Sequence, residues 1–188
     1  MPLIHWGPDD LLRRLDDVLA VYGAAMAYPR DLIFSRRSFV ASHAARPGFR
    51  AVATLADDGT LLGFGYGYTS SPGQWWHEQV RAALPRPVYH SWMDDCFELV
   101  ELHVSPEAQG HGTGQGQLTA LLTGVPRSTV LLSTPEVPRE ASRAWRLYRR
   151  LGFLDVLRHF HFPGDERPFA VLGRSLPLDP PAPGKRRS

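Results

Sequence analysis

The chain has 188 residues, which is the size of one domain and leaves little room for a second. With 43% hydrophobic and 21% charged residues it has enough apolar side chains for a packed core, which excludes a disordered chain. The formal net charge of +2 is carried entirely by the final segment, 175–188, so the body is neutral and lacks the excess positive charge that a broad nucleic-acid-binding face needs.

Hydrophobic periodicity and turn residues predict an alternation of helices and strands along the chain. In chain order the predicted elements are helices 9–22 and 31–45, strands 49–55 and 61–68, helix 75–84, strand 97–104, a helix ending near residue 122, strand 129–133, helix 140–151, and strands 153–160 and 168–173. These elements place residues 1–174 in one domain, and we expect the Pro-rich, basic segment 175–188 to be a flexible tail.

The predicted strand 61–68 has two unlike faces. Leu62, Phe64, Tyr66 and Tyr68 stand on one face, and three glycines stand on the other. A bare face is typical of a strand against which a helix packs closely. The alternative is that the bare face is a floor over which a ligand passes.

A glycine-rich turn joins the strand 97–104 to the helix that follows it. It reads Gln-Gly-His-Gly-Thr-Gly-Gln-Gly over residues 109–116. Backbone N–H groups at a helix start are unpaired and lie at the positive end of the helix dipole, so the turn indicates a phosphate or diphosphate site. It has no lysine, which excludes a P-loop, and its glycine spacing departs from the dinucleotide fingerprint. Tight packing is the alternative explanation for the glycines.

Two motifs resemble those of the GNAT superfamily of N-acetyltransferases. The first is Gln-x-x-Gly-x-Gly at 109–114, preceded by a strand that ends Leu-His-Val-x-Pro at 102–106, and it resembles the family's acetyl-CoA-binding motif. The second, Arg-Leu-Tyr-Arg-Arg-Leu-Gly-Phe at 146–153, resembles the family's helix in which a Leu-Tyr pair runs into Gly-Phe. The resemblance covers roughly residues 49–173 and implies a single α/β domain with a mixed central β-sheet and helices on both faces.

The resemblance also implies where acetyl-CoA, the acetyl donor, would bind. Backbone groups at the end of the strand 97–104 would receive the pantetheine arm, and the amides of the glycine turn would hold the diphosphate. Many members have asparagine at the start of the second motif, whereas this chain has Ala141 followed by Ser142, which would replace it only in part. The implied cofactor-binding residues are Leu102, His103, Val104, Gln109, Gly110, His111, Gly112, Thr113, Gly114 and Ser142.

Acetyl transfer from a thioester to an amine needs a base, a donor to the oxyanion and an acid for the departing thiolate. The resemblance places Glu98 where some members carry a catalytic glutamate, with Glu101 in reserve or paired with an arginine. Their separation of three residues puts them on opposite faces of a strand unless a bulge intervenes. Tyr148, in the Leu-Tyr pair, is the implied acid, and a core tyrosine is the alternative.

The long excursion 69–95 between two strands is the leading candidate for the acceptor site. Its aromatic side chains would wall a pocket and its acidic ones would attract a cationic amine, unless they form a small core beneath the loop. Tyr22 and Tyr28 would form the opposite wall. The expected substrate-binding residues are Trp75, Trp76, Glu78, Trp92 and Asp94.

We therefore expect an acetyl-CoA-dependent N-acetyltransferase that acts on a primary amine of a small-molecule or peptide acceptor. Direct transfer in a ternary complex is expected, because the single cysteine, Cys96, has no adjacent histidine to activate it. One cysteine also excludes a multi-cysteine zinc site, and no metal is expected. The alternative function is a non-catalytic acyl-CoA-binding sensor on the same fold.

The sequence also bears on location and partners. No apolar run is long enough to span a membrane, and Asp9 and Asp10 stand where a signal peptide would be apolar. A cytoplasmic protein without a nucleic-acid or membrane partner is therefore expected. A homodimer formed through an edge strand stays open.

Overall fold

A seven-stranded sheet forms the centre of the molecule in the computed structural model, which describes residues 1–136 and 142–178. The strands follow in the order β1-β2-β3-β4-β5-β7-β6, and every neighbouring pair is antiparallel except β4 and β5. This arrangement confirms the mixed sheet that the resemblance implied. The strands are β1 (Leu3–Trp6), β2 (Arg50–Leu55), β3 (Leu61–Thr69), β4 (Cys96–Val104), β5 (Thr129–Pro135), β6 (Leu154–Phe160) and β7 (Phe169–Ser175).

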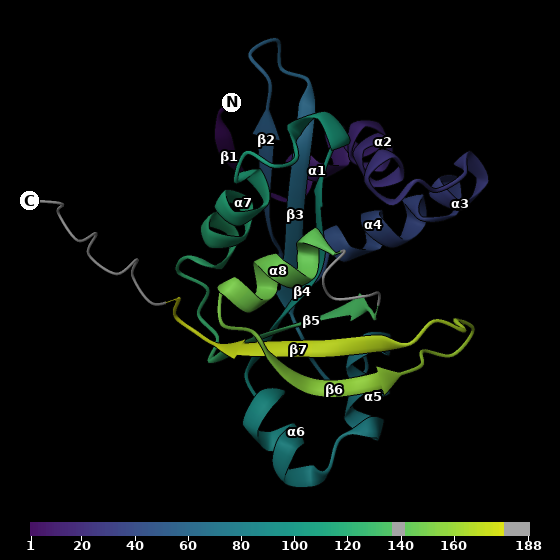
Figure 1. The fold of residues 1–188 in the computed structure, drawn as a ribbon, viewed down its shortest axis with the longest axis vertical. Helices are drawn as coiled ribbons and strands as arrows, with labels where there is room; N and C mark the ends of the chain where they lie inside the picture. The colour runs from purple at the N-terminus through teal and green to yellow at the C-terminus, as the bar shows by residue number, and fades with distance from the viewer. Residues whose placement is uncertain (137–141, 179–188) are drawn as a thin grey trace, which may run out of the picture.

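Helices cover both faces of the sheet, as expected (Figure 1). They are α1 (Pro8–Arg13), α2 (Leu15–Met26), α3 (Arg30–Ser35), α4 (Arg37–Ala44), α5 (Trp75–Ala83), α6 (Arg86–Trp92), α7 (Thr113–Leu122) and α8 (Arg143–Arg150), with a 3-10 turn at Pro106–Ala108. Ala51 and Ala53 of β2 belong to the core under α1–α4, whereas Val52 between them belongs to the core under α7 and α8. Leu131 of β5 faces α5 and α6 in a third core.

Helix α7 lies against the bare face of β3. A Cβ on Gly63 would meet Nε2 of Gln117 at 2.5 Å, and one on Gly65 would meet Cδ2 of Leu121 at 3.7 Å. The prediction of a closely packed helix is therefore confirmed. The aromatic face of β3 points to the other side of the sheet, where Phe64 joins the core under α1–α4.

Two elements are absent from the sequence-based prediction. Strand β1 has only four residues, too few to show an alternation of apolar and polar side chains. Helix α6 carries Pro87 in its first turn, where a helix tolerates proline, but prolines are equally typical of a loop and the segment shows no clear helical period. The first two predicted helices are each divided in two, at Arg14 and at Arg36.

Strands β4 and β5 separate after a short pairing. Within the described residues they pair only at Cys96, Phe97 and Glu98 of β4. The remainder of β4, residues 99–104, keeps its ladder with β3, and no strand of the described part of the chain pairs with its other edge. Figure 1 shows β2 and β3 running vertically while β6 and β7 cross them almost horizontally. The sheet therefore opens between β4 and β5.

The chain leaves the sheet along a packed path after β7. The N–H of Leu176 donates to the carbonyl oxygen of Ser128 at 2.8 Å, and Leu176 and Leu178 pack against the core under α7 and α8. The rest of the expected tail, 179–188, and the first residues of the predicted helix 140–151 lie outside the described residues. None of the described helices is long and apolar enough to cross a bilayer.

Candidate active site

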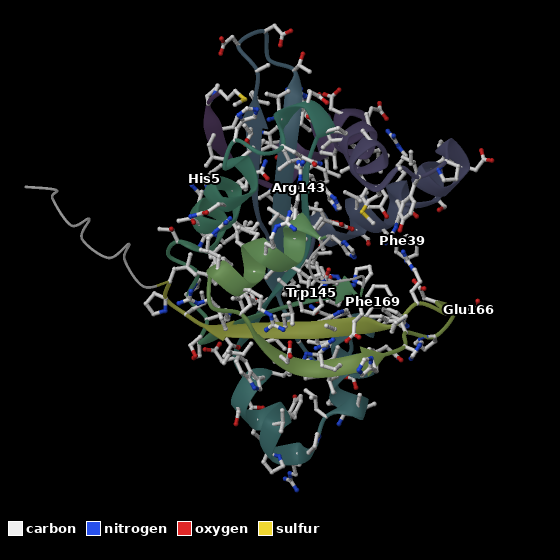
Figure 2. The ribbon with its side chains drawn as sticks, in the orientation of Figure 1. His5, Phe39, Arg143, Trp145, Glu166 and Phe169 are labelled. Carbon is white, nitrogen blue, oxygen red and sulfur yellow. The ribbon has the colours of Figure 1, made fainter. Side chains whose placement is uncertain are left out.

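A cavity of about 1300 Å³ occupies the opening between β4 and β5. One wall consists of the turn after β4, the first turn of α7, and α8. The other consists of parts of α2 and α4, the start of α5 and the β6–β7 hairpin. Figure 2 labels three of the lining residues, Arg143 on α8, Phe39 on α4 and Phe169 on β7.

The glycine turn presents free backbone donors to this cavity. Gly110 and Gly112 have φ values of 86° and 80°, a conformation that favours glycine, and a Cβ at either would meet nothing within 4 Å. The first hydrogen bond of α7 runs from the N–H of Gly116 to the carbonyl of Gly112 at 2.9 Å. The N–H groups at 113–115 therefore have no acceptor inside the helix, and they fit an anion such as a diphosphate.

Gln109 ties the glycine turn to its neighbours. Its Nε2 donates to the carbonyl oxygen of Val104 at 2.9 Å, and its Oε1 accepts a hydrogen bond from Nη1 of Arg143 at 2.9 Å. Arg146 and Arg150 of α8 line the cavity as well. Guanidinium groups match phosphate oxygens in geometry and charge, so this wall suits a phosphate-bearing ligand such as coenzyme A.

Eight of the ten expected cofactor-binding residues line the cavity, namely Leu102, His103, Val104, Gln109, Gly110, Gly112, Thr113 and Gly114. The other two do not. His111 is exposed, and Ser142 caps α8, where its Oγ accepts a hydrogen bond from the N–H of Trp145 at 3.3 Å. A serine occupied as a helix cap has less freedom to bind a pantetheine amide.

A β-bulge in β4 brings the two glutamates to one face. Glu101 pairs with Tyr66 and Glu98 with Tyr68, so the register shifts between them and β4 has one extra residue, at Val100. Tyr66 and Tyr68 are two residues apart and share a face of β3, and the two glutamates therefore share that face too. Both line the cavity. The bulge is the exception that the alternation argument had left open.

Glu98 is the buried acid of the cavity, with 4% of its surface exposed. Burial raises the pKa of its carboxyl group to about 8, although the nearby Arg46 and a hydrogen bond with Tyr68 act in the opposite direction. Its Oε2 has no hydrogen-bond partner among the described residues. A buried carboxyl oxygen that has no hydrogen-bond partner and lies at a cavity wall can accept a hydrogen bond from a ligand or a water.

Tyr148 reaches the cavity from the opposite face of the sheet. It is 7% exposed on α8, and its ring packs against Phe153 with centroids 5.6 Å apart. Burial, and to a lesser degree the charge of Glu101, raise the pKa of its hydroxyl well above the usual 10. The hydroxyl therefore keeps its proton and can serve as a donor.

Glu101 has a histidine partner. Its Oε2 lies 2.6 Å from Nε2 of His103, and both side chains are largely buried. The His103 ring meets Tyr22 edge-on with centroids 5.1 Å apart. Tyr22 and Tyr28 both line the cavity, as expected for the wall opposite the excursion.

The excursion 69–95 contributes two of its five expected residues to the cavity. Trp75 and Trp76 line it, and Trp75 packs against Phe162 of the β6–β7 hairpin with centroids 5.5 Å apart. Trp76 also donates from Nε1 to Oγ of Ser133 at 3.1 Å and belongs to the core under α5 and α6. The excursion therefore forms both a pocket wall and a small core.

Glu78, Trp92 and Asp94 lie away from the cavity, because α5 and α6 fold back over β5 and β7. Oε2 of Glu78 accepts a hydrogen bond from Arg81 at 3.0 Å. Asp94 lies 2.9 Å from the His90 ring. Trp92 packs so closely on β7 that a Cβ on Gly173 would meet its ring at 2.8 Å.

Several cavity residues were not anticipated from the sequence. They are Arg36, Phe39, Ser42, His43, Arg46, Tyr68, Asp165 and Arg167. Those on and beside α4 recur at helical spacing. This periodicity is visible in the sequence, but most of these residues are polar and so they do not form an apolar stripe. Arg167 donates from Nη1 to the Tyr28 hydroxyl at 3.0 Å, so the β6–β7 hairpin and the end of α2 meet across the cavity. That contact joins residues 139 positions apart, which no local pattern encodes.

Comparisons with known proteins agree with this geometry. No family model matches the sequence. A curated relative, the GCN5-like protein acetyltransferase of Mycobacterium tuberculosis, is 45% identical over 94% of this chain and 98% of its own length. A solved acetyltransferase of the GNAT family from Bacillus cereus has a TM-score of 0.60 at 16% identity, covering 93% of this chain and 96% of that one. An aminoglycoside 6′-N-acetyltransferase complexed with coenzyme A has a TM-score of 0.65 at 15% identity, covering 94% and 98%.

Proposed function

The chain belongs to the GNAT family of acetyltransferases, and from that premise we propose that it transfers an acetyl group from acetyl-CoA directly to a primary amine in a ternary complex. One observation carries the proposal. The bulge at Val100 turns Glu98 and Glu101 to the same face of β4, at the point where β4 leaves β5. A base is thus available on one side of the opening, and the glycine turn supplies anion donors on the other.

Acetyl-CoA, when bound, supplies an activated acyl carbon in its thioester. Residues 99–104 of β4 offer a strand edge without a partner, which suits the extended amides of the pantetheine arm. The N–H groups of the glycine turn would hold the diphosphate, and Arg143, Arg146 and Arg150 would add positive charge beside it. These roles account for the wall formed by the turn and α8.

The chain's own groups account for each proton that moves. Glu98, once deprotonated, takes a proton from the attacking amine, directly or through one water. A backbone N–H on the open edge of β4, at Val104 or a neighbour, donates to the oxygen that becomes negative. Tyr148 gives its proton to the departing sulfur. Afterwards Glu98 releases the proton it took to solvent and Tyr148 regains one from solvent, so the enzyme returns to its starting state.

The acceptor is the part of the reaction on which relatives differ. The M. tuberculosis relative is named a protein acetyltransferase, and one protein of similar fold is named for aminoglycosides. We propose a small-molecule or peptide amine, which the cavity admits between α4 and the β6–β7 hairpin. The rival function, a sensor that binds acyl-CoA without turnover, would leave the unpaired Oε2 of Glu98 without a use.

The experiment measures release of coenzyme A from acetyl-CoA with a panel of amines. We expect amine-dependent release by the wild type and a loss of about 100-fold or more in kcat for Glu98→Gln, because a general base contributes on that order. Coenzyme A binding should persist in the variant. The sensor hypothesis expects binding with no turnover for any amine, and no effect of the substitution on an activity that is absent.

A further inference from the structure

Two arginines flank α4 on the cavity wall that is formed by α2, α4, the start of α5 and the β6–β7 hairpin, which is called the acceptor wall below. Arg36 precedes the helix and Arg46 follows it, and His43 lies between them in sequence and in space. The pKa of His43 is lowered to about 4 by burial and by the two arginines, and its Nδ1 lies 3.0 Å from the Tyr66 hydroxyl. His43 is therefore neutral at pH 7, and the positive charge on either side of it in the sequence is that of the two guanidinium groups.

Neither guanidinium is neutralised by a carboxylate at ion-pair distance within the described chain. Arg46 donates one bond, from Nη1 to the Tyr68 hydroxyl at 3.2 Å, and lies 4.7 Å from the centre of that ring. Arg36 lies 5.5 Å from the ring centre of Tyr22 and is also hydrogen-bonded to that side chain, and the nearby charge of Glu101 attracts it. Each guanidinium carries five N–H donors, so donors remain at the cavity wall for an anion.

The third arginine of this wall differs in that respect. Arg167 is bound by both carboxylate oxygens of Asp165, through Nε at 3.0 Å and Nη2 at 2.7 Å, and uses Nη1 for Tyr28. The positive charge of Arg167 is therefore compensated by the carboxylate of Asp165. Arg36 and Arg46 differ from Arg167 in having no carboxylate at ion-pair distance within the described chain, although the charge of Glu101 acts on Arg36 and that of Glu98 on Arg46.

Two hydrogen bonds in succession link Arg46 on the acceptor wall to Glu98, the proposed base. Arg46 donates to the Tyr68 hydroxyl, and that hydroxyl is hydrogen-bonded in turn to Glu98. The two groups are thus two hydrogen bonds apart. At one end stands a buried carboxyl oxygen without a partner, and at the other a guanidinium with free donors. A ligand that satisfies both needs an N–H group and an anion only a few bonds apart.

We propose that the acceptor carries a carboxylate close to its reactive amine, with the amine at Glu98 and the carboxylate on Arg46 and Arg36. The proposal rests on the proposed acetyl transfer and narrows its substrate class. A free amino acid has this chemistry, and so has a peptide whose N-terminal residue is aspartate. A polycation such as a polyamine or an aminoglycoside has the opposite chemistry, because its further positive charges would face two guanidinium groups that have no ion-pair partner in the described chain.

The first arm of the test compares matched acceptors in an assay of coenzyme A release. The free L-amino acids are compared with their carboxamides, and peptides Asp-Lys-Asp with Asn-Lys-Asn, alongside spermidine and kanamycin. We expect kcat/KM to be at least about tenfold higher for the carboxylate member of the productive pair, since a charge-assisted hydrogen bond is worth about that much. Which pair responds distinguishes a free amino acid from a peptide.

The second arm tests the two arginines. Arg46→Gln and Arg36→Gln should raise KM for the carboxylate acceptor by roughly tenfold to hundredfold and bring the preference over the carboxamide toward one. Arg46→Lys should keep part of that preference, because lysine keeps the positive charge but cannot donate two parallel hydrogen bonds to a carboxylate. The matched control is Arg37→Gln. Arg37 lies on α4 but forms an ion pair with Asp16 and does not line the cavity, so its removal should leave the preference unchanged.

The outcomes separate this proposal from the one beneath it. Equal or faster transfer to carboxamides or polycations overturns the acceptor class and leaves acetyl transfer standing. An Arg46→Gln variant that slows both members of a pair equally assigns Arg46 a structural role through Tyr68 and also overturns the proposal. No transfer to any amine in the panel, with coenzyme A still bound, contradicts the proposed function itself.

Discussion

Glu98 is a carboxyl group that folding has removed from water, and as the proposed general base it can act only when it is deprotonated. Burial penalises the carboxylate more than Arg46 and the Tyr68 hydroxyl favour it, which raises its pKa to about 8. At pH 7 the group therefore holds its proton in most molecules. A general base has to release that proton before it can accept one from an amine.

The rate of acetyl transfer should follow that titration. We expect kcat to rise with pH through an apparent pKa near 8 and to level off above it, because only the carboxylate form of Glu98 accepts a proton. The measurement is a pH profile with an amine whose own pKa lies well outside the range. Glu98→Gln should lack the rising limb, and a flat wild-type profile between about pH 6 and about pH 9 would count against Glu98 as the base.

The same group should make stability depend on pH. The folded state raises the pKa from 4.5 to about 8, so between those values the folded protein holds a proton that the unfolded chain has released. The free energy of unfolding therefore falls as pH rises across this window, by about 1.4 kcal/mol per pH unit for this one group. Glu98→Gln stays neutral and lacks this slope.

Urea unfolding of the wild type and of Glu98→Gln at several pH values measures the difference. The gap in favour of the variant should widen from about pH 5 to about pH 8. A gap that stays constant with pH would show that Glu98 titrates normally in the folded protein. This outcome would also remove the reason for the expected activity profile.

Residue identities were more predictable than residue positions. The Leu-Tyr pair and the position before the glycine turn singled out Tyr148 and Glu98 as candidates. Whether Glu98 and Glu101 share a face depends on the bulge at Val100, which arises from the pairing of β4 with β3 and leaves no mark in the order of residues. Arg46 was missed because its neighbours come from β3, distant in sequence.

Among the elements, the glycine turn before α7 is the one that we propose binds the acetyl donor. Gly112 has a φ of 80°, caps α7 and lines the cavity. A glutamate at this position would strain the backbone and place a negative charge at the proposed diphosphate site. We expect Gly112→Glu to weaken coenzyme A binding by about 100-fold or more, measured by calorimetry.

The control for this substitution is Gly59→Glu in the turn between β2 and β3. Gly59 has a φ of 86°, and a Cβ there also meets nothing within 4 Å, so the backbone strain is matched. The position does not line the cavity, and coenzyme A binding should be unchanged. Equal binding by both variants would mean that the turn is only a tight connection.

Elements with a strong period were predicted well, and short ones were not. The alternation in β3 and the apolar stripe of α8 identify both elements from the sequence. The four residues of β1 carry no period, and the prolines around α6 are compatible with a loop or a helix start. The excursion 69–95 was expected to serve the acceptor, and most of it instead packs on β5 and β7.

At the scale of the whole molecule, the opening of the sheet between β4 and β5 forms the candidate active site. It allows Glu98 and Tyr148, which belong to opposite faces, to reach one cavity. The two motifs that resemble those of the GNAT family both lie beside this opening, so they predicted the fold class together with the position of the opening. The wall proposed to receive the acceptor comes from α2, α4 and the β6–β7 hairpin, whose contacts are long-range and are not encoded by any local pattern.

Direct transfer across this opening requires both substrates to be present together. Cys96 does not offer another route, because it is buried and its pKa is raised to about 12 by desolvation. The most direct measurement is the initial rate of coenzyme A release as acetyl-CoA and an accepted amine are varied together. The account predicts intersecting lines in the double-reciprocal plot and no mass increase of the enzyme with acetyl-CoA alone. Parallel lines accompanied by an acetylated enzyme would contradict it.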